Sequence, residues 1–469
     1  MPQDAHCESR LVAELKQIVG EAGLLTGSDV RLRSCDPFRP IPIESPAIVR
    51  PASVAELSRV MALCSALGQR VVIHGGRTGV SGGAFAGADE LVISLERLNR
   101  IEEICAVTYT AVVQAGVVLE ALQNAVAERG MLYPVDLGAK GSATIGGMIA
   151  TNAGGNRVLR WGMTRQNLLG VEAVLADGTV VSNMNRLLKN NTGYDLKHLF
   201  IGSEGTLGIV TRAVVRLVPA PVSQSVAFVS VQSYRKLLAL LGLARRLATL
   251  SAFEVMWRDY YELVAASGSG RRPVEPAQPY YVLIEALGQN KELDEKLFEQ
   301  FLVGAYEEEL VADAVTATSG KQVAELWRVR EGSEVIVREF GAFVSTDVSI
   351  DLRHIEEFLA RLKSLLQTRY PGVRTATFGH LGDNNIHIAI NVGPDTIGEE
   401  SNVERLLFQA VGEFAGAITA EHGIGRLKRE FLPEHRSPAE MGVMRQIRAA
   451  LDPAGLLNRE VLFRTGEGS

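Results

Sequence analysis

Residues 145–155 read Ile-Gly-Gly-Met-Ile-Ala-Thr-Asn-Ala-Gly-Gly, and three further glycine-rich segments lie at 75–83, 134–142 and 201–209. The stretches around them include runs typical of strands, such as 170–175 and 209–218. Glycine lets a backbone turn sharply and approach a ligand closely, because it has no Cβ atom. The glycine density between 75 and 208 therefore indicates backbone wrapped around one long ligand.

The loop at 75–83 directly follows a short apolar strand, 71–73. Its glycines Gly76, Gly79 and Gly82 do not give the G-x-G-x-x-G spacing of a Rossmann fold, and a second strand at 91–95 follows where that fold would open a helix. Successive backbone N–H groups in such a loop can still form a nest for a pyrophosphate. The alternative for this loop alone is a purely structural turn.

Composition excludes several protein classes. The chain has 469 residues, 46% of them hydrophobic and 22% charged, with a formal net charge of −6 and no basic run typical of nucleic-acid binding. Its four cysteines form no C-x-x-C pair, which disfavours a disulfide framework or a cysteine zinc site. Residues 1–10 are polar, and no run of about 18 apolar residues occurs, so we expect neither a secretory signal nor a membrane span. These features predict a cytoplasmic enzyme.

Local signals divide the chain into three parts. The apolar pattern predicts a helix over 9–24 closed by Gly23, and Ser53 with Glu56 forms a capping box for a helix that stops at Gly68. Pro219 and Pro221 mark a change after which strands (226–231, 280–286) alternate with helices (234–250, 354–368). We therefore expect domains at 1–220 and 221–420 and a C-terminal segment at 421–469, with a helix around 441–451.

Two short segments carry residues suited to a metal. The first, 377–389, places His380 and His387 on either side of a turn between two strand-like runs. The second, 420–425, contains Glu421 and His422 followed by glycine. Two imidazoles plus a carboxylate, with one position open, form a catalytic metal arrangement. The spacing is not a standard zinc signature, and the alternative is a pair of hydrogen-bonded histidines in a β-hairpin.

Taken together, these motifs resemble the flavin domain of the vanillyl-alcohol oxidase superfamily. Within it the chain is similar to the branch of D-2-hydroxyglutarate dehydrogenase, D-lactate dehydrogenase and the glycolate oxidase flavin subunit, in order from about residue 45 to 458. The resemblance implies an α+β fold: a two-subdomain FAD-binding domain of PCMH type, an α+β substrate (cap) domain, and a C-terminal helical segment that supplies the catalytic Glu-His pair and packs on the FAD domain.

The resemblance also implies which residues hold the cofactor. A covalent His is expected in some relatives where this chain has Thr78, and His74 at the strand end is interpreted as a structural histidine, so the FAD is expected to be non-covalent. The residues expected to contact FAD are Gly75, Gly76, Thr78, Gly79, Ser81, Gly82, Pro134, Asp136, Gly141, Ser142, Gly146, Gly147, Asn152, Gly155, Glu204, Gly205, Ile209 and Asn458.

In metal-dependent members of the family, the residues matching His380, His387 and Glu421 ligate Zn²⁺ or Mn²⁺, and the one matching His422 is the base. The residue matching Arg330 clamps the substrate carboxylate with its planar guanidinium. The alternative for Arg330 is a surface helix residue paired with Glu334. Asp383 and Asn385 are expected to shape the turn or orient the imidazoles.

These roles combine into a mechanism. Arg330 would bind the carboxylate, His422 would take the proton of the 2-hydroxyl, whose pKa a bound metal would lower, and FAD would take a hydride as the 2-hydroxy acid becomes a 2-oxo acid. Three positions depart from the D-2-hydroxyglutarate oxidisers: Glu334 replaces Thr, Ser345 replaces Lys and Ala389 replaces Asn. Loss of a cation and gain of a carboxylate disfavour a second substrate carboxylate. We therefore expect a monocarboxylate, such as D-lactate or a larger D-2-hydroxy acid.

Other functions stay open on the sequence. The chain could be a D-2-hydroxyglutarate or D-malate dehydrogenase that holds the distal carboxylate differently, or a flavin subunit of a glycolate-oxidase-like complex. A flavin-free zinc-binding structural protein is a third alternative. The expected electron acceptor is an electron-transfer flavoprotein or a quinone, the expected metal is Zn²⁺ or else Mn²⁺, and a homodimer is considered.

Overall fold

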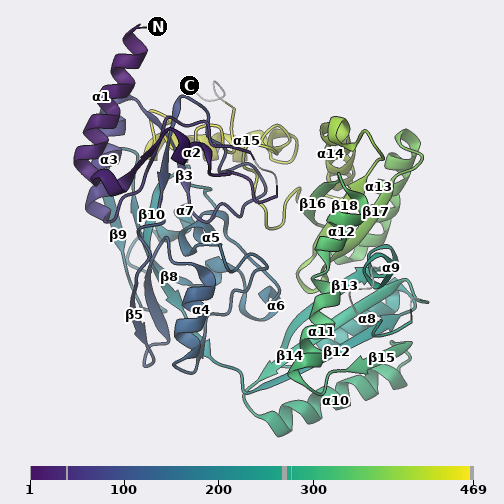
Figure 1. The fold of residues 1–469 in the computed structure, drawn as a ribbon. Helices are drawn as coiled ribbons and strands as arrows, with labels where there is room; N and C mark the ends of the chain where they lie inside the picture. Colours follow the sequence, from purple (N-terminus) through teal and green to yellow (C-terminus); the bar gives the residue numbers. More distant parts are fainter. Residues whose placement is uncertain (1, 39–40, 267–271, 276, 465–469) are drawn as a thin grey trace. The chain divides into compact units, whose positions relative to one another are not determined.

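The structure is a computed structural model that describes the chain except for residues 1, 39–40, 267–271, 276 and 465–469 (Figure 1). The chain forms two compact units. Unit 1 comprises residues 1–155, 162–220 and 421–469, and unit 2 comprises 156–161 and 221–420. Each unit mixes helices with sheet, so the α+β fold class is confirmed.

Unit 1 contains two main sheets. The first has the order β1–β2–β4–β3, in which β4 pairs in parallel with both β2 and β3. The second is antiparallel, with the order β5–β6–β10–β8–β9. Their strands are Leu24–Thr26 (β1), Ala47–Val49 (β2), Arg70–His74 (β3), Glu90–Ser94 (β4), Ile101–Cys105 (β5), Thr110–Gln114 (β6), Leu168–Val174 (β8), Val180–Asn183 (β9) and Ile209–Arg216 (β10); β7 (Met131–Leu132) pairs with β11 (Val218–Pro219).

The helices of unit 1 follow the predicted signals closely at α3 (Val54–Leu67). Ser53 accepts a hydrogen bond from the Glu56 N–H, and Gly68 ends the helix with φ +65°. The prediction for 9–24 is wrong at both ends, because α1 runs Pro2–Val19 and Gly20, at φ +71°, ends it before a short 3-10 turn. The other helices are α2 (Ser28–Arg31), α4 (Leu119–Ala127), α5 (Ile145–Thr151), α7 (Lys197–Phe200) and α15 (Pro438–Leu451).

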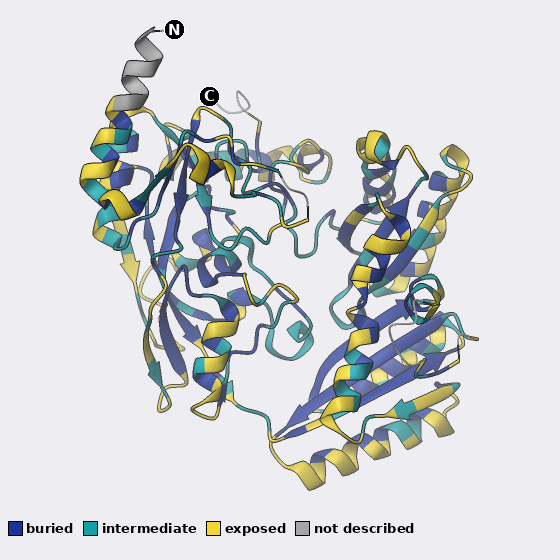
Figure 2. Ribbon diagram, in the orientation of Figure 1, coloured by how far each residue is buried: buried dark blue, intermediate teal, exposed yellow. Residues whose placement is uncertain are grey.

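Unit 2 is built on a seven-stranded antiparallel sheet of order β15–β12–β14–β13–β17–β18–β16. Figure 2 shows these strands largely buried, with exposed residues on the outer faces of the helices. The strands are Ser223–Val231 (β12), Leu250–Trp257 (β13), Tyr280–Gly288 (β14), Asp313–Thr316 (β15), Val344–Ser349 (β16), Arg374–His380 (β17) and Asn385–Asn391 (β18). The helices are Val158–Trp161 (α6), Tyr234–Ala244 (α8), Arg258–Ala266 (α9), Lys291–Glu307 (α10), Gly320–Arg330 (α11), Ser333–Phe340 (α12), Ile355–Arg369 (α13) and Thr396–Glu413 (α14).

One predicted helix of unit 2 is too long. The apolar residues of 234–250 suggested one continuous helix, but α8 ends at Ala244 and Leu250 already begins β13. Cross-strand pairing of β13 with β14 and β17 outweighs the local helical pattern at this point. Among the described residues, no helix is both long enough and apolar enough to cross a membrane.

Candidate active site

In unit 1 the glycine loops that lie far apart in sequence pack against one another. A Cβ atom on Gly76 would lie 2.0 Å from the carbonyl oxygen of Ser142, and one on Gly155 would lie 1.9 Å from the carbonyl oxygen of Asp136. A Cβ on Gly75 would lie 2.6 Å from Thr144 Oγ1. Backbone therefore approaches backbone here so closely that only glycine fits.

The same loops leave groups suited to a ligand. The hydroxyl of Thr144 is buried without a hydrogen-bond partner, and it lies next to the Cβ positions of both Gly75 and Gly147. A Cβ on Gly79 or Gly83 would meet nothing within 4 Å. Buried hydroxyls normally have partners. An unsatisfied hydroxyl beside a glycine-rich loop with open space fits the polar pyrophosphate part of a dinucleotide cofactor.

The segment that begins with Glu421 is anchored to these loops. Ser81 Oγ lies 2.9 Å from the carbonyl oxygens of both His422 and Gly423. The Glu204 carboxylate accepts hydrogen bonds from the N–H groups of Ile424 (2.9 Å) and Gly425 (2.8 Å). Burial raises the pKa of Glu204, although these two N–H groups act in the opposite direction. Glu204 therefore holds the backbone that carries His422.

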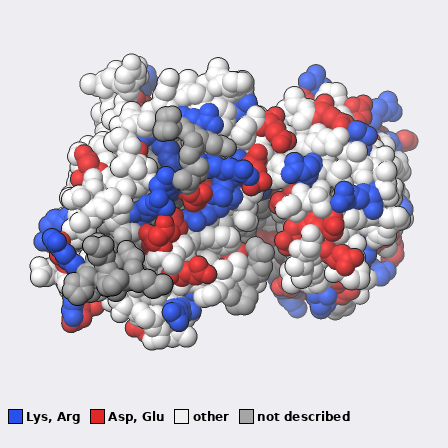
Figure 3. Space-filling view, turned by 90° about the horizontal axis from the view of Figure 1, so that it is seen from above, with Lys and Arg blue, Asp and Glu red and all other residues white. Residues whose placement is uncertain are grey.

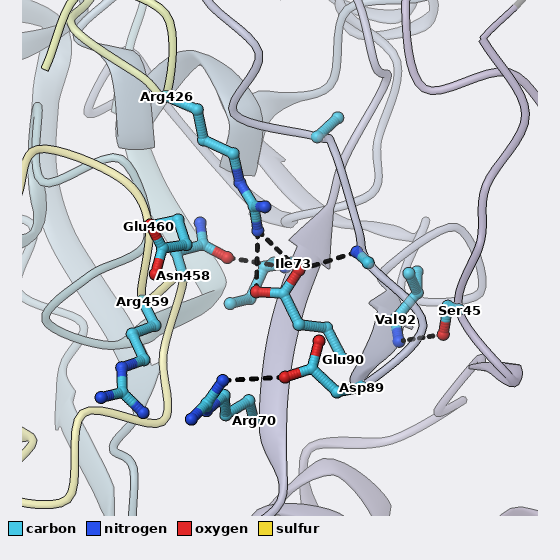
Figure 4. A network of polar contacts seen from close by, with 12 residues as sticks. Ser45, Arg70, Ile73, Asp89, Glu90, Val92, Arg426, Asn458, Arg459 and Glu460 are labelled. Atoms are coloured by element: carbon cyan, nitrogen blue, oxygen red, sulfur yellow. Dashed lines mark hydrogen bonds and ion pairs between the residues drawn. The ribbon is translucent and has the colours of Figure 1, made fainter. Parts of the chain in front are cut away.

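Asn458 serves a similar purpose. Its Oδ1 accepts from the Ile73 N–H at 3.0 Å (Figure 4). Its Nδ2 donates to the Glu204 carbonyl at 2.7 Å, so both ends of the amide bind backbone. Nearby, Arg426 forms an ion pair with Glu90 at 2.7 Å (Figure 4). The side chain of Asn458 thus joins β3 to the Glu204 turn.

All of the residues expected to bind FAD lie in unit 1, but several use their side chains on protein. Asp136 binds Gln123 and Lys140, and Asn152 accepts from the Arg165 N–H. Ile209 is buried in the hydrophobic core. These three side chains therefore bind or pack against protein. The other residues expected at the loops are Gly75, Gly76, Thr78, Gly79, Ser81, Gly82, Pro134, Gly141, Ser142, Gly146, Gly147, Gly155 and Gly205.

His74 has a structural environment. It is 1% exposed, and its Nε2 lies 2.8 Å from the carbonyl oxygen of Ala84. Burial lowers the pKa of His74 to about 4. The imidazole is therefore neutral at ordinary pH and holds the end of β3 to the following loop.

In unit 2 the register of four strands places the site residues on one face of the sheet. Residues opposite each other in antiparallel strands share a face. One row runs Glu254–His380–Asn385–Ser349 from β13 to β16. The next row runs Met256–Phe378–His387–Asp347. His380 and His387 thus project from the same face of the sheet, on the two strands of a hairpin.

A buried carboxylate that the sequence did not indicate lies at the centre of this face. Glu254 is 1% exposed; its Oε2 lies 2.8 Å from both His380 Nδ1 and Arg330 Nε. Burial alone would raise the pKa of Glu254, but the charges of His380 and Arg330 outweigh burial and hold it below its usual range. Arg330 is buried at the end of α11 and pairs with Glu254, so the alternative pairing with Glu334 is wrong.

Aromatic contacts complete the arrangement. The Arg330 guanidinium lies 4.9 Å from the centre of the Phe378 ring, and Phe378 stacks on His387 at 5.1 Å. The rings of His387 and His380 lie edge to face at 5.3 Å. Glu254, His380, His387, Phe378 and Arg330 therefore form a closed circuit of contacts, called here the Glu254 circuit.

The predicted metal ligands come together. Ligand atoms of His380, His387 and Glu421 lie within 4.8 Å of one another. Glu421 directly follows Ala420, whose N–H donates to the buried carboxylate of Asp347 (2.9 Å). The Gly155 N–H donates to Glu421 Oε1 (3.2 Å). This set of two imidazoles and a carboxylate suits a divalent ion.

Asn385 is a second group whose environment points to a ligand. It is 3% exposed, and neither Nδ2 nor Oδ1 of its side chain has a hydrogen-bond partner. It lies beside His380 in the same row of the sheet. A buried amide left unpaired costs free energy, so this side chain fits a site that is completed by a metal-bound or substrate oxygen.

The three positions that depart from the hydroxyglutarate pattern occupy different environments. Ser345 and Ala389 are opposite each other on β16 and β18, one row beyond His387. Ala389 is buried, whereas Ser345 and Glu334 are exposed. Ala389 belongs to a buried hydrophobic cluster with Ala376 and Phe340, so the position beyond His387 is apolar.

Comparison with known proteins agrees with this geometry. A family model described as "FAD binding domain" matches residues 45–183, and one described as "FAD linked oxidases, C-terminal domain" matches 220–462. The chain belongs to the FAD-linked oxidases. It is an FAD flavoprotein of the oxidoreductase class, and the predicted family is confirmed.

Named relatives of this family cover most of the chain. D-2-hydroxyglutarate dehydrogenase of Xanthomonas citri pv. viticola is 41% identical over 89% of this chain and 89% of that protein. The D-2-hydroxyglutarate dehydrogenase of Stutzerimonas stutzeri is 34% identical over 97% of this chain and 98% of that protein. A provisionally named mitochondrial D-lactate dehydrogenase of Schizosaccharomyces pombe is 34% identical over 97% and 90%.

Solved structures confirm the predicted vanillyl-alcohol-oxidase-type fold. p-Cresol methylhydroxylase with substrate bound superposes with a TM-score of 0.77 at 15% identity, covering 98% of each chain. The 4-ethylphenol oxidase of Gulosibacter chungangensis gives 0.73 at 17% identity, covering 97% of each.

Proposed function

We propose that the chain is an FAD-dependent, metal-assisted dehydrogenase that oxidises a D-2-hydroxy acid to the 2-oxo acid. The observation that carries this proposal is the Glu254 circuit, in which the buried Arg330 of α11 contacts the sheet face that carries two histidines of the metal-ligand group. The names of the relatives support the same substrate class.

Each side chain of the site has a role in this reaction. Arg330 binds the substrate carboxylate: Glu254 engages its Nε, which leaves the terminal nitrogens for a second partner. His422 takes the proton of the 2-hydroxyl as general base, and Ser81 and Glu204 fix the backbone from His422 to Gly425. FAD, held non-covalently at 75–83, 134–155 and 201–209, would accept a hydride from the substrate carbon when bound.

The proposed metal centre consists of His380, His387 and Glu421. Glu254 accepts from His380 Nδ1, and a carboxylate can only accept, so Nδ1 carries the hydrogen and Nε2 is left as the ligand atom. A divalent ion, Zn²⁺ or else Mn²⁺, would lower the pKa of the substrate hydroxyl when bound there. Asn385 is available to bind an oxygen at the same site.

The favoured substrate is a D-2-hydroxy monocarboxylate, such as D-lactate or a larger acid. The buried methyl group of Ala389, one row beyond His387, favours an apolar substituent, and neither exposed Ser345 nor exposed Glu334 supplies a cation. D-2-hydroxyglutarate is the second candidate, because relatives that are 41% and 34% identical bear that name. The electron acceptor, a homodimer and a cytoplasmic location remain predictions.

The test is an anaerobic titration of the purified flavoprotein with D- and L-2-hydroxy acids, followed by flavin absorbance at about 450 nm. The expected result is bleaching by D-monocarboxylates that is lost after treatment with a chelator and restored by Zn²⁺ or Mn²⁺. Preferential bleaching by D-2-hydroxyglutarate would support the second candidate. Bleaching that survives complete metal removal would contradict the metal-assisted reaction.

A further inference from the structure

Glu254 is placed to act on two functional groups at once. It projects from β13, a central strand of the sheet. Its side chain is 1% exposed, and those of its partners Arg330 and His380 are each 7% exposed. His380 Nδ1 lies within 2.9 Å of Oε1 and 2.8 Å of Oε2, and Arg330 Nε lies 2.8 Å from Oε2. One carboxylate therefore fixes both side chains.

The geometry on the Arg330 side restricts the guanidinium to one orientation. Phe378 lies under its plane, and the Tyr260 hydroxyl donates to the Arg330 carbonyl at 2.8 Å. With its Nε bound to Glu254 and its Cζ over the Phe378 ring, the guanidinium loses much of its rotational freedom. Fixing a long, rotamer-rich side chain before the ligand arrives removes much of the entropic cost of binding.

The geometry on the His380 side fixes the ring nitrogen that faces a metal. A carboxylate that accepts from Nδ1 selects the tautomer and makes Nε2 a better ligand, an effect typically worth 10–100-fold in metal affinity. Since His387 also contacts Phe378, a shift of Arg330 would be transmitted to both imidazoles. Removing the Glu254 charge would also leave Arg330 buried without a counter-charge.

We propose that Glu254 is a positioning residue that couples metal binding at His380 to carboxylate binding at Arg330. This inference rests on the proposed function. It assigns no contact with substrate to Glu254; the effect acts through the orientation of the two partners and through the shared negative charge.

The variant Glu254→Gln tests the coupling, and Glu285→Gln is the matched control. Glu285 is a buried glutamate on the neighbouring strand β14, is 0% exposed, and forms hydrogen bonds with Ser251, Gln224, Arg157 and Trp327. It thus carries the same chemistry in the same sheet, and it even contacts the helix of Arg330, without touching His380 or Arg330. Glu254→Asp keeps the negative charge, but its side chain is one methylene shorter, so the carboxylate lies farther from His380 and Arg330.

The measurements are made on FAD-loaded protein stripped of metal. Zn²⁺ affinity is measured by competition with a chromophoric chelator, and the affinity for a 2-oxo monocarboxylate by the change in flavin absorbance. For Glu254→Gln we expect Zn²⁺ affinity to fall 10–100-fold and 2-oxo acid affinity to fall about tenfold, with smaller losses for Glu254→Asp and less than twofold changes for Glu285→Gln. Flavin content and the unfolding midpoint show whether each variant is folded.

Loss of both affinities in Glu254→Gln alone supports the coupling. Loss of only one, or equal losses in Glu285→Gln, overturns it. If Glu254→Gln does not fold, Glu254→Asp decides: unchanged affinities for Zn²⁺ and the 2-oxo acid overturn the coupling. If the wild-type protein itself binds neither Zn²⁺ nor Mn²⁺, the proposed metal centre is wrong and the inference fails with it, an outcome that the wild-type titration reveals separately.

Discussion

At the scale of single residues, the site depends on a few buried charges that satisfy one another. Arg330 and Glu254 are charged groups that are almost never buried unless paired, and here each is the other's partner. Arg330 and His422 could be proposed from local sequence motifs. Glu254 could not, because its role arises from the register of β13 with β17, which brings it to a histidine 126 positions away.

The variant Arg330→Lys tests the carboxylate clamp. A lysine ammonium keeps the charge but cannot bind Glu254 through one nitrogen and present a planar pair of donors to substrate. We expect kcat/KM for the preferred D-2-hydroxy acid to fall about 100-fold, mainly through KM, because a charge-assisted bidentate contact is lost. Arg374→Lys is the control, since Arg374 stacks on Phe340 away from Glu254. An unchanged KM in Arg330→Lys would contradict the assigned role.

A second residue-scale prediction concerns acid stability. Burial alone would raise the pKa of Glu96, but hydrogen bonds from Arg33 (2.6 Å) and Arg50 (2.9 Å) outweigh it and lower the pKa to about 2. Because the folded-state pKa lies below the unfolded one, the stabilisation is present above about pH 4.3 and is lost as pH falls toward 2. The side chain is 35% exposed, so solvent screening limits the effect.

For Glu96→Gln we therefore expect a loss of about 1 kcal/mol in the unfolding free energy of unit 1 at pH 7, and a smaller difference from wild type at pH 3.5. The unfolding free energy of unit 1 is measured from the release of flavin as urea is added. Glu103→Gln is the control, because the exposed Glu103–Arg186 pair should contribute little. A difference that grows in acid would refute the assignment.

At the scale of elements, local sequence signals predicted the helices and strands whose ends carry capping or turn residues. The ends of the other elements depend on pairing between strands that are distant in sequence. Ser53 and Gly68 delimit α3 as expected. The end of α8 was missed because the apolar pattern continues past Ala244, whereas the chain turns there and enters β13 at Leu250, which pairs with β14. The glycine loops were recognised as a set, but their mutual packing, including the role of Thr144, depends on contacts that no single segment encodes.

The element that carries His422 offers a direct test of that packing. Gly425 has φ +54°, and a Cβ there would lie 1.9 Å from the Ser81 carbonyl oxygen. Gly425→Ala should displace the segment, destabilise the protein by about 3 kcal/mol and reduce bound FAD per chain. Gly455→Ala is the control: it has φ +62° but open space, so only backbone strain of about 1 kcal/mol is expected. Equal effects of the two substitutions would show that the close approach is unimportant.

At the scale of the whole molecule, the two units divide the expected ligands between them. The flavin loops belong to unit 1, while both histidines of the proposed metal centre belong to unit 2. The surface charge is also uneven: Figure 3 shows Lys and Arg gathered on part of unit 1 with acidic side chains beside them. The sequence predicts a domain boundary near Pro219 and Pro221 from a change in composition.

Hydrogen exchange should therefore report two separate responses. FAD is expected to protect amides in 71–83, 134–155 and 201–209, whereas Zn²⁺ protects β17 and β18, because a ligand stabilises the unit that binds it. At a free ligand concentration of 100 times its dissociation constant, each ligand should raise the unfolding free energy of its unit by about 2.7 kcal/mol. His387→Ala should abolish the Zn²⁺ response and preserve the FAD response. Zn²⁺ protection confined to unit 1 would contradict the proposed centre.

The chain leaves unit 1 at Ala220 and returns at Glu421, and everything that would recognise the acid group and hold the imidazole ligands lies between those points. Glu421 and His422 stay with the flavin loops. Exchanging residues 156–161 and 221–420 together between family members should therefore transfer substrate specificity, while the recipient keeps its own redox chemistry and proton acceptor.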